Sequence, residues 1–185
     1  MPQSIIDAGQ AKMEKAVETF KTGLQLIKTG RANPGLLNKV RVSYYGSDMP
    51  INQIATISTP EATTLMIKPF DKSILRDIEK AIATSGLGLN PQNDGQVLRI
   101  FFPPLTEAVR KDLVKEVKKQ LEEAKVSIRN IRREVNEDLK DLEKESLISE
   151  DELKNRQDDC QKMTDKFIVK LEEVAKDKEK SILEF

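Results

Sequence analysis

The sequence predicts an α+β fold, in which an elongated antiparallel three-helix bundle carries a small inserted β/α/β domain on a hinge. Residues 106–145 contain no Gly and no Pro and keep a seven-residue apolar repeat, which is typical of a long helix packed along other helices. Segments near both ends of the chain have the same repeat. The stretch between them holds most of the Gly and Pro residues and several β-branched runs. We therefore expect a bundle of residues 1–30 and 105–185, with residues 31–104 as the inserted domain.

Size and composition limit what the chain can be. Its 185 residues can form one large or two small domains, and 38% hydrophobic with only 4% aromatic residues suits narrow cores. The formal net charge is +0, so nucleic-acid binding would have to come from a local basic patch. No apolar run approaches the length of a membrane span, and the first residues lack a charged-then-apolar leader. We expect a soluble, cytoplasmic protein that binds no membrane.

The residues that most often carry catalysis are missing. The chain has no His, the commonest proton shuttle and metal ligand, and it has a single Cys, Cys160. Cys160 falls on an apolar column of a predicted helix, so we expect it in the core. No Gly-rich phosphate-binding loop ending in Lys-Ser/Thr is present. We expect no enzyme, no cofactor and no metal site.

The first helix is predicted over Ser4–Lys28. Its apolar positions recur every seven residues: Ile6, Met13, Phe20 and Ile27. The following Thr29-Gly30 is a helix-stop signal.

The middle of the chain predicts strands and one short helix. The strands are expected at Val40–Tyr45, Gln53–Thr59, Thr64–Lys68 and Gln96–Phe102. Asp71 is suited to cap a helix that continues to Ser85 and is stopped by Gly86. Residues 87–95 are expected to form a loop.

The long predicted helix, Thr106–Glu145, has segregated charges. Basic residues occupy two neighbouring heptad columns, and acidic residues occupy columns on the other side. Arg129, Arg132, Arg133 and Asn136 follow an i, i+3, i+4, i+7 spacing and so share one face. Three guanidiniums on a rigid helix suit phosphate, whereas the alternative is a solvated face with i,i+4 ion pairs. The spacing alone leaves both interpretations open.

The last helix is predicted to begin after Ser149, which forms a capping box with Glu152, and to continue to about Phe185. Its apolar column again has a spacing of seven: Leu153, Cys160, Phe167 and Val174. Three helices of this kind, two of them joined by a short turn, predict a three-helix bundle.

The connections between bundle and inserted domain are both marked by helix-breaking residues. Two single-strand connections at one end of a helical body are typical of an inserted domain on a hinge, although caps and turns alone would also need such residues. The expected hinge residues are Thr29, Gly30, Arg31, Pro103, Pro104 and Leu105.

Six motifs, in their order and spacing, resemble the bacterial ribosome recycling factor family over the full length of the chain. They are Lys28-Thr29-Gly30-Arg31-Ala32, Tyr44-Tyr45-Gly46, Leu87-Gly88-Leu89-Asn90-Pro91, Pro103-Pro104-Leu105-Thr106-Glu107, Arg110-Lys111-Asp112-Leu113 and Arg129-Asn130-Ile131-Arg132-Arg133. The resemblance implies an L-shaped molecule with a three-helix bundle and a hinged α/β domain.

The resemblance also implies a function and its partners. Proteins of this family act with elongation factor G and GTP to split the post-termination ribosome into subunits, which frees mRNA and deacylated tRNA. The bundle is expected to dock on large-subunit ribosomal RNA. Its phosphate contacts would come from Arg129, Arg132, Arg133, Arg110, Lys111 and Arg31. We expect a monomer.

Two other functions fit the same patterns. One is a coiled-coil adaptor or chaperone whose α/β domain binds a protein client, with little dependence on salt. The other is a general RNA-binding module, which would bind isolated RNA as well as ribosomes.

Overall fold

The structure, a computed structural model, describes residues 2–27 and 29–184, which form two compact units. One unit combines the residues up to Leu24 with Lys111–Glu184, and the other spans Gln25–Arg110. The domain limits expected from the sequence, 31 and 104, lie a few residues inside the second unit and stay a prediction. The expected ends of the first and last helices, Lys28 and Phe185, lie outside the described residues.

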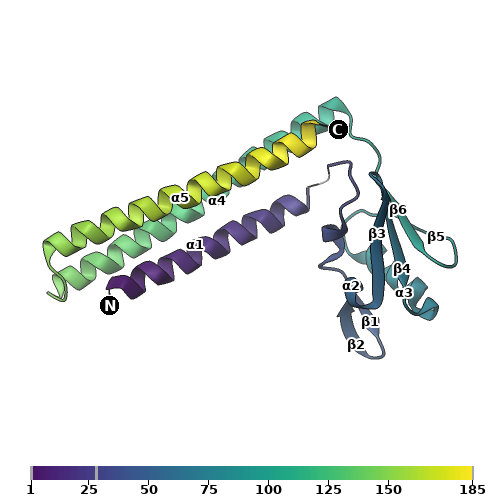
Figure 1. Cartoon of the computed structure of the whole chain (residues 1–185), viewed down its shortest axis with the longest axis horizontal. Coiled ribbons are helices and arrows are strands. Elements are labelled where there is room, and N and C mark those ends of the chain that lie inside the picture. The colour runs from purple at the N-terminus through teal and green to yellow at the C-terminus, as the bar shows by residue number, and fades with distance from the viewer. Residues whose placement is uncertain (1, 28, 185) are drawn as a thin grey trace. The chain divides into compact units, whose positions relative to one another are not determined.

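Three long helices form the first unit: α1 (Pro2–Gln25), α4 (Glu107–Lys144) and α5 (Glu150–Leu183). They lie side by side along their lengths (Figure 1). Lys12 pairs with Glu134 and Gly23 lies beside Gln120, so α1 runs antiparallel to α4. A short turn reverses the chain between α4 and α5. The predicted antiparallel three-helix arrangement is therefore present.

The apolar repeat gives the core of this bundle. Buried positions of α1 are Ile6, Met13, Val17, Phe20 and Leu24, as the repeat predicts. Ile27 is also buried, as the repeat predicts, but the predicted helix end was too late, because α1 ends at Gln25. On α4, Val117, Ile128, Val135 and Leu139 are buried, whereas Asp138, next to Leu139, is exposed.

Cys160 lies in this core, as expected. It packs with Ile6, Val135 and Leu139, and it is fully buried. Burial raises the pKa of its thiol, so the sulfur is held as an unreactive small hydrophobe.

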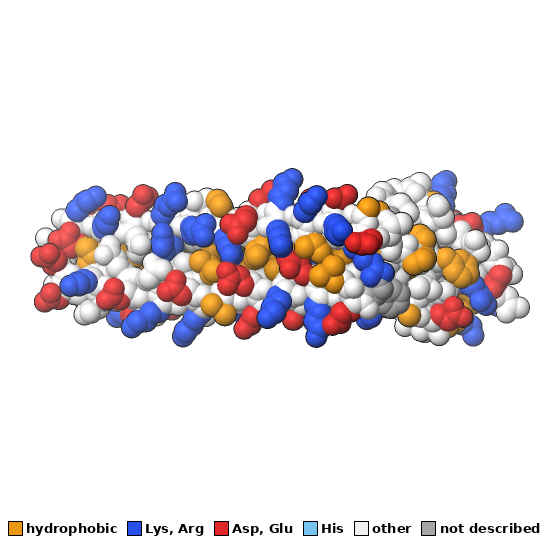
Figure 2. All heavy atoms as spheres, turned by 90° about the horizontal axis from the view of Figure 1, so that it is seen from above, with side chains coloured by type: hydrophobic (Ala, Val, Ile, Leu, Met, Phe, Trp, Pro, Cys, Tyr) orange, Lys and Arg blue, Asp and Glu red, His pale blue; other side chains and the backbone are white. Residues whose placement is uncertain are grey.

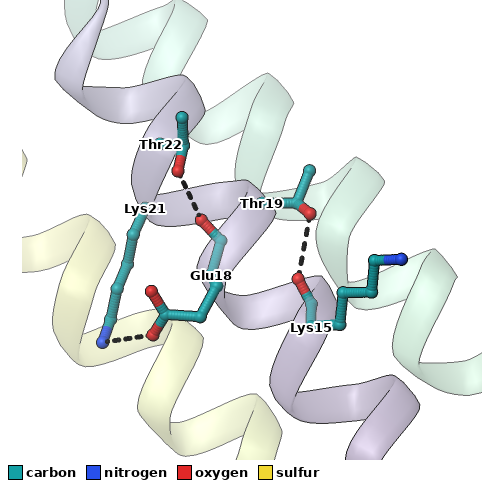
Figure 3. A network of polar contacts seen from close by, with 5 residues as sticks. All are labelled: Lys15, Glu18, Thr19, Lys21 and Thr22. Carbon is teal, nitrogen blue, oxygen red and sulfur yellow. Dashed lines mark hydrogen bonds and ion pairs between the residues drawn. The ribbon is translucent and has the colours of Figure 1, made fainter. Parts of the chain in front are cut away.

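The exposed hydroxyls of α1 bond within their own helix. Thr19 donates to the carbonyl of Lys15, and Thr22 donates to that of Glu18, whose carboxylate pairs with Lys21 (Figure 3). Such back-bonding satisfies the Thr hydroxyls without a partner helix. The start of α5 is also as predicted, because the Ser149 hydroxyl accepts a 3.2 Å hydrogen bond from the amide of Glu152.

The second unit contains two antiparallel sheets and a helix (Figure 1). A hairpin joins β1 (Arg41–Tyr44) to β2 (Ser47–Pro50). A four-stranded sheet has the order β3-β4-β6-β5, made of Ala55–Glu61, Thr64–Pro69, Leu98–Phe101 and Pro91–Asn93. A 3-10 turn, η2 (Lys72–Ile74), leads into α3 (Leu75–Thr84), and Asp71 caps it by accepting a bond from the amide of Ser73.

The core of the second unit is a single apolar cluster. It joins residues of the 3-10 turn η1 (Pro34–Leu37), the short helix α2 (Ile51–Ile54), α3 and both sheets. Its fully buried side chains include Leu65, Ile67, Ile78, Ile82 and Ile100.

Three expectations for this unit were wrong. Residues 51–54 form a helical turn where a strand was expected to begin. The hairpin strand β2 was not predicted. It is joined to β1 by a two-residue turn at Tyr45 and Gly46, and both residues have the positive φ that such a turn requires (47° and 81°). The expected loop 87–95 contains β5, a three-residue edge strand that starts at Pro91, where a missing amide is tolerated.

Candidate nucleic-acid interface

The arginine face of α4 consists of Arg129, Arg132 and Arg133, and the structure brings all three together as the spacing predicts. Arg129 and Arg132 are half-buried, and Arg133 is exposed. The Nη1 of Arg132 donates a 2.9 Å hydrogen bond to Oε1 of Gln161 on α5. None of the three lies on the apolar seam occupied by Ile128 and Val135.

The arginine face is not neutralised by acidic side chains. Within residues 2–27 and 29–184, Arg129, Arg132 and Arg133 form no ion pair with a carboxylate. Lysines elsewhere on α4 do form such pairs, as Lys115 does with Asp112. The alternative of a face cross-linked by i,i+4 ion pairs therefore does not describe these arginines. Their guanidinium groups keep N–H donors available for an anion.

The two charged sides of α4 face different neighbours. On the acidic side, Glu116 and Glu123 line a groove of about 720 Å³ between α1 and α4. On the basic side, Lys125 reaches α5 and pairs with Glu172 at 2.7 Å. Figure 2 shows one face of the bundle, where Lys, Arg, Asp and Glu side chains border a strip of hydrophobic atoms. The charge segregation predicted from the heptad columns thus has a structural counterpart.

The other predicted contact residues are divided between the two units. Arg31 and Arg110 belong to the second unit, and Lys111 belongs to the first. Arg31 and Lys111 are exposed, whereas Arg110 is half-buried. Their membership of one binding surface with the arginine face stays a prediction.

Among the residues expected to form the hinge, Gly30 lies close to both Leu105 and Pro103. Gly30 has a φ of +75°, and a Cβ placed on it would lie 3.4 Å from Cγ of Leu105 and 3.8 Å from the carbonyl oxygen of Pro103. The incoming and outgoing chain segments of the second unit are therefore neighbours. A positive φ at this position favours Gly over any other residue.

Gln161 is a residue of this site that the sequence did not single out. It accepts from Arg132 and donates a 2.8 Å bond to Asp165, which orients its amide. A glutamine on a charged helix carries no signal of such a role, because its partner comes from a different helix.

Comparison with known proteins gives the family. The family model described as "Ribosome recycling factor" matches residues 20–183. The "Ribosome-recycling factor" of Geobacillus sp. (strain WCH70) is 55% identical over 184 residues, with 100% of both chains covered. That of Bacillus cereus (strain B4264) is 53% identical over 184 residues, again with 100% of both chains covered.

The chain belongs to the ribosome recycling factor family.

Solved structures of ribosome recycling factors agree with this assignment. A solution structure of the ribosome recycling factor matches with a TM-score of 0.85 and 41% identity, and the match covers 100% of this chain and 98% of that one. A second match has a TM-score of 0.68 and 46% identity and covers 99% of both chains. It is described as models for the T. thermophilus ribosome recycling factor and the E. coli elongation factor G bound to the E. coli post-termination complex.

Family membership decides between the functions that the sequence left open. It supports ribosome recycling over a coiled-coil adaptor or chaperone, and it identifies a translation factor rather than an enzyme. The predicted α+β fold is confirmed, since long helices and a small antiparallel sheet domain are both present. Among the described residues, no helix combines the length and apolarity needed to cross a bilayer.

Proposed function

We propose that this protein recycles ribosomes: with elongation factor G and GTP, it splits the post-termination ribosome into subunits and releases mRNA and deacylated tRNA. The observation that carries the proposal is identity of about half of all residues to ribosome-recycling factors along the whole chain. The partners are the ribosome and elongation factor G, both of which are bound with the recycling factor of the solved complex. The chain would act as a monomer in the cytoplasm.

The bundle is proposed as the anchoring part, through large-subunit ribosomal RNA. The arginine face supports this role, because its guanidiniums form no ion pair with any carboxylate that the structure describes and can donate to phosphate oxygens. Arg110, Lys111 and Arg31 are proposed to extend the contact. Since the net charge of the chain is +0, the attraction would come from these local groups and not from the molecule as a whole.

Residues 31–104 are proposed to form the moving part, joined at Thr29, Gly30, Arg31, Pro103, Pro104 and Leu105. Elongation factor G would push on this domain after GTP hydrolysis. Two adjacent chain crossings allow rotation of a domain about the line that joins them. Force applied to the domain would then strain the contacts between the ribosomal subunits.

Anchoring can be tested by co-sedimentation of the full chain with purified ribosomes at increasing salt. Replacing Arg132 by Ala should weaken binding and reduce the magnitude of the salt slope by roughly one unit, because one phosphate contact is lost. Lys144→Ala is the matched control, since it removes a cation of the same helix that already pairs with Asp141. Unchanged affinity and slope for Arg132→Ala would contradict the anchoring role.

The hinge can be tested with a covalent cross-link between the two units. Cysteine pairs, one residue in each unit, would be introduced in a Cys160→Ala background and joined by a short bifunctional reagent. The cross-linked protein should still bind ribosomes but lose the ability to split them with elongation factor G and GTP, and reversal of the link should restore splitting. A pinned protein that splits ribosomes at the normal rate would rule the hinge out.

A further inference from the structure

Three lysines form an uninterrupted row on α5, which we call the lysine ridge: Lys162, Lys166 and Lys170. All three are exposed, and their i, i+4, i+8 spacing puts them on one side of the helix. With a rise of about 1.5 Å per residue, the backbone positions of successive ridge lysines are roughly 6 Å apart along the helix axis. The predictions made from the sequence did not include them.

The lysine ridge borders a groove between α1 and α5. This groove has a volume of about 490 Å³, and besides the lysines it is lined by Ile6, Gln10, Glu14, Asp159, Met163 and Phe167. Lys170 holds its Nζ 5.9 Å from the ring centroid of Phe167, a cation–π contact. The ridge thus stands along one wall of an open channel with an apolar floor.

Two acidic residues also line this groove. Asp159 pairs with Arg156 at 3.5 Å, whereas Glu14 accepts a 3.0 Å hydrogen bond from the neutral amide of Gln10 and keeps its charge. Among the residues that the structure describes, the three ridge lysines form no ion pair with a carboxylate. Lys115, Lys144 and Lys180 do pair, with Asp112, Asp141 and Glu184, whereas Lys118, Lys119 and Lys140 of α4 share the lack of an ion pair within this part of the chain. The ridge therefore holds three exposed ammonium groups that no carboxylate contacts directly among the described residues, and they outnumber the two acids of the groove.

The lysine ridge is separate from the arginine face. Arg132 reaches α5 at Gln161, whereas Lys162 and its ridge neighbours line the groove toward α1. The helix α5 is consequently bordered by basic side chains on two sides.

We infer that the lysine ridge is a second contact of the bundle with ribosomal RNA, in which the three ammonium groups bind successive phosphates of one RNA strand along the α1–α5 groove. This inference rests on the proposed function. A polyanion is the occupant that the ridge fits, because the three lysine charges are regularly spaced, exposed and of one sign. Lysine also suits a contact with backbone phosphates, since its ammonium is a flexible point charge that needs no fixed base geometry.

The test compares two triple variants of the full chain with equal net charge. In the first, Lys162→Gln, Lys166→Gln and Lys170→Gln remove the ridge; in the second, Lys115→Gln, Lys144→Gln and Lys180→Gln remove three lysines that are already paired. Ribosome binding measured against salt should show the slope of the ridge variant reduced by about 2 to 3 units. The control variant should keep a slope close to that of the parent chain. Equal slopes for the two variants would overturn the inference.

A second measurement identifies the occupant. A photo-cross-linking amino acid at position 166 should join the protein to ribosomal RNA, and a cross-link to a ribosomal protein or to elongation factor G would overturn the inference. The arginine face serves as an independent reference. If Arg132→Ala loses binding while the ridge variant binds normally, the RNA contact inferred for the ridge is refuted and the proposed function stands. If the parent chain does not bind ribosomes, the proposed function itself is refuted.

Discussion

The guanidinium of Arg132 on α4 donates to the amide oxygen of Gln161 on α5, and the Gln161 amide nitrogen in turn donates to Asp165. These two hydrogen bonds connect α4 to α5 and end on the Asp165 carboxylate. They orient Arg132, but Arg132 itself forms no direct ion pair with that carboxylate. An arginine held in this way loses less side-chain freedom when it meets a phosphate. Gln161 is therefore a positioning residue for the arginine face.

Replacing Gln161 by Ala should weaken ribosome binding by about 2- to 10-fold, the equivalent of one hydrogen bond. The salt slope should stay the same, because no charge is removed. This combination separates a positioning role from a phosphate contact, whose loss lowers both affinity and slope. Gln120→Ala is the control, since Gln120 bonds to Glu116 on the side of α4 that faces α1. Equal binding by both variants would show that the orientation of Arg132 is unimportant.

The Lys125–Glu172 pair should make the free energy of unfolding of the bundle fall as the pH rises through the alkaline range. The hydrogen bond to Glu172 is the main cause of a raised pKa for Lys125, and burial opposes it. Because the folded-state pKa lies above the ordinary 10.5, the pair stabilises the fold at lower pH and its contribution disappears as the pH rises through the raised value.

Lys125→Met should accordingly lower the free energy of unfolding by about 1 kcal/mol at pH 7, an amount limited by solvent around the half-exposed Glu172. Urea titrations at several pH values should show this difference shrinking above pH 10.5. A difference that grows with pH would contradict the assignment. Lys144→Met, at a pair exposed on both sides, should have a smaller effect.

The helices α1 and α4 pack tightly at Gly9, where a side chain would not fit. A Cβ on Gly9 would lie 2.5 Å from Cγ2 of Val135, which is buried and stiff because it is β-branched. Gly9→Ala should therefore destabilise the protein by about 1 to 2 kcal/mol, although Ala is the better helix former. In a Val135→Ala background the same change should cost nothing or be stabilising, a coupling that a double-mutant cycle measures.

Gly23→Ala is the matched control for this prediction. Its added Cβ would meet only the end of the flexible Gln120 side chain, at 3.2 Å. We expect it to be neutral or to stabilise the protein by up to about 1 kcal/mol through helix propensity. A loss at Gly23 as large as that at Gly9 would remove the packing explanation.

Substitutions at Gly30 and Gly46 can distinguish an effect on the proposed hinge from an effect of backbone strain alone. Both have positive φ, +75° and +81°, so Ala should cost roughly 1 to 2 kcal/mol at either position. Gly30→Ala should slow ribosome splitting, because it changes the entry to the proposed moving domain beside Leu105. Gly46→Ala, in the distant hairpin turn, should leave splitting unchanged in an assay with elongation factor G and GTP. Equal splitting rates would leave Gly30 with a structural role only.

The helices of this protein were predictable because their signal is long and repeated. An apolar repeat carried along helices of 24, 38 and 34 residues outweighs local variation, so only the ends moved, as near Ile27. The strands β2 (Ser47–Pro50) and β5 (Pro91–Asn93) were not predictable from the sequence, because both are short and mostly polar and have no alternating pattern. They exist because partner strands and turns satisfy their backbone, as when the Asp94 carboxylate accepts from the amides of Gln96 and Val97.

The candidate site divides in the same way. The spacing of Arg129, Arg132 and Arg133 along one helix was enough to place them on one face. The role of Gln161 and the groove beside Lys166 depend on which helix lies next to α5 and at what height. That information lies between segments that are far apart in the sequence, and no periodicity within one helix contains it.

The bundle is assembled from two pieces of chain separated by the whole of Gln25–Arg110, and this has a consequence during synthesis. At about 5 to 20 residues per second, α1 leaves the synthesising ribosome several seconds before α4 and α5 exist. Meanwhile the segment that follows α1 can collapse into its own apolar core. During this time the apolar side chains of α1, among them Met13, Phe20 and Leu24, stay exposed because their partner helices have not been made. Chaperones that bind exposed apolar segments would therefore bind α1.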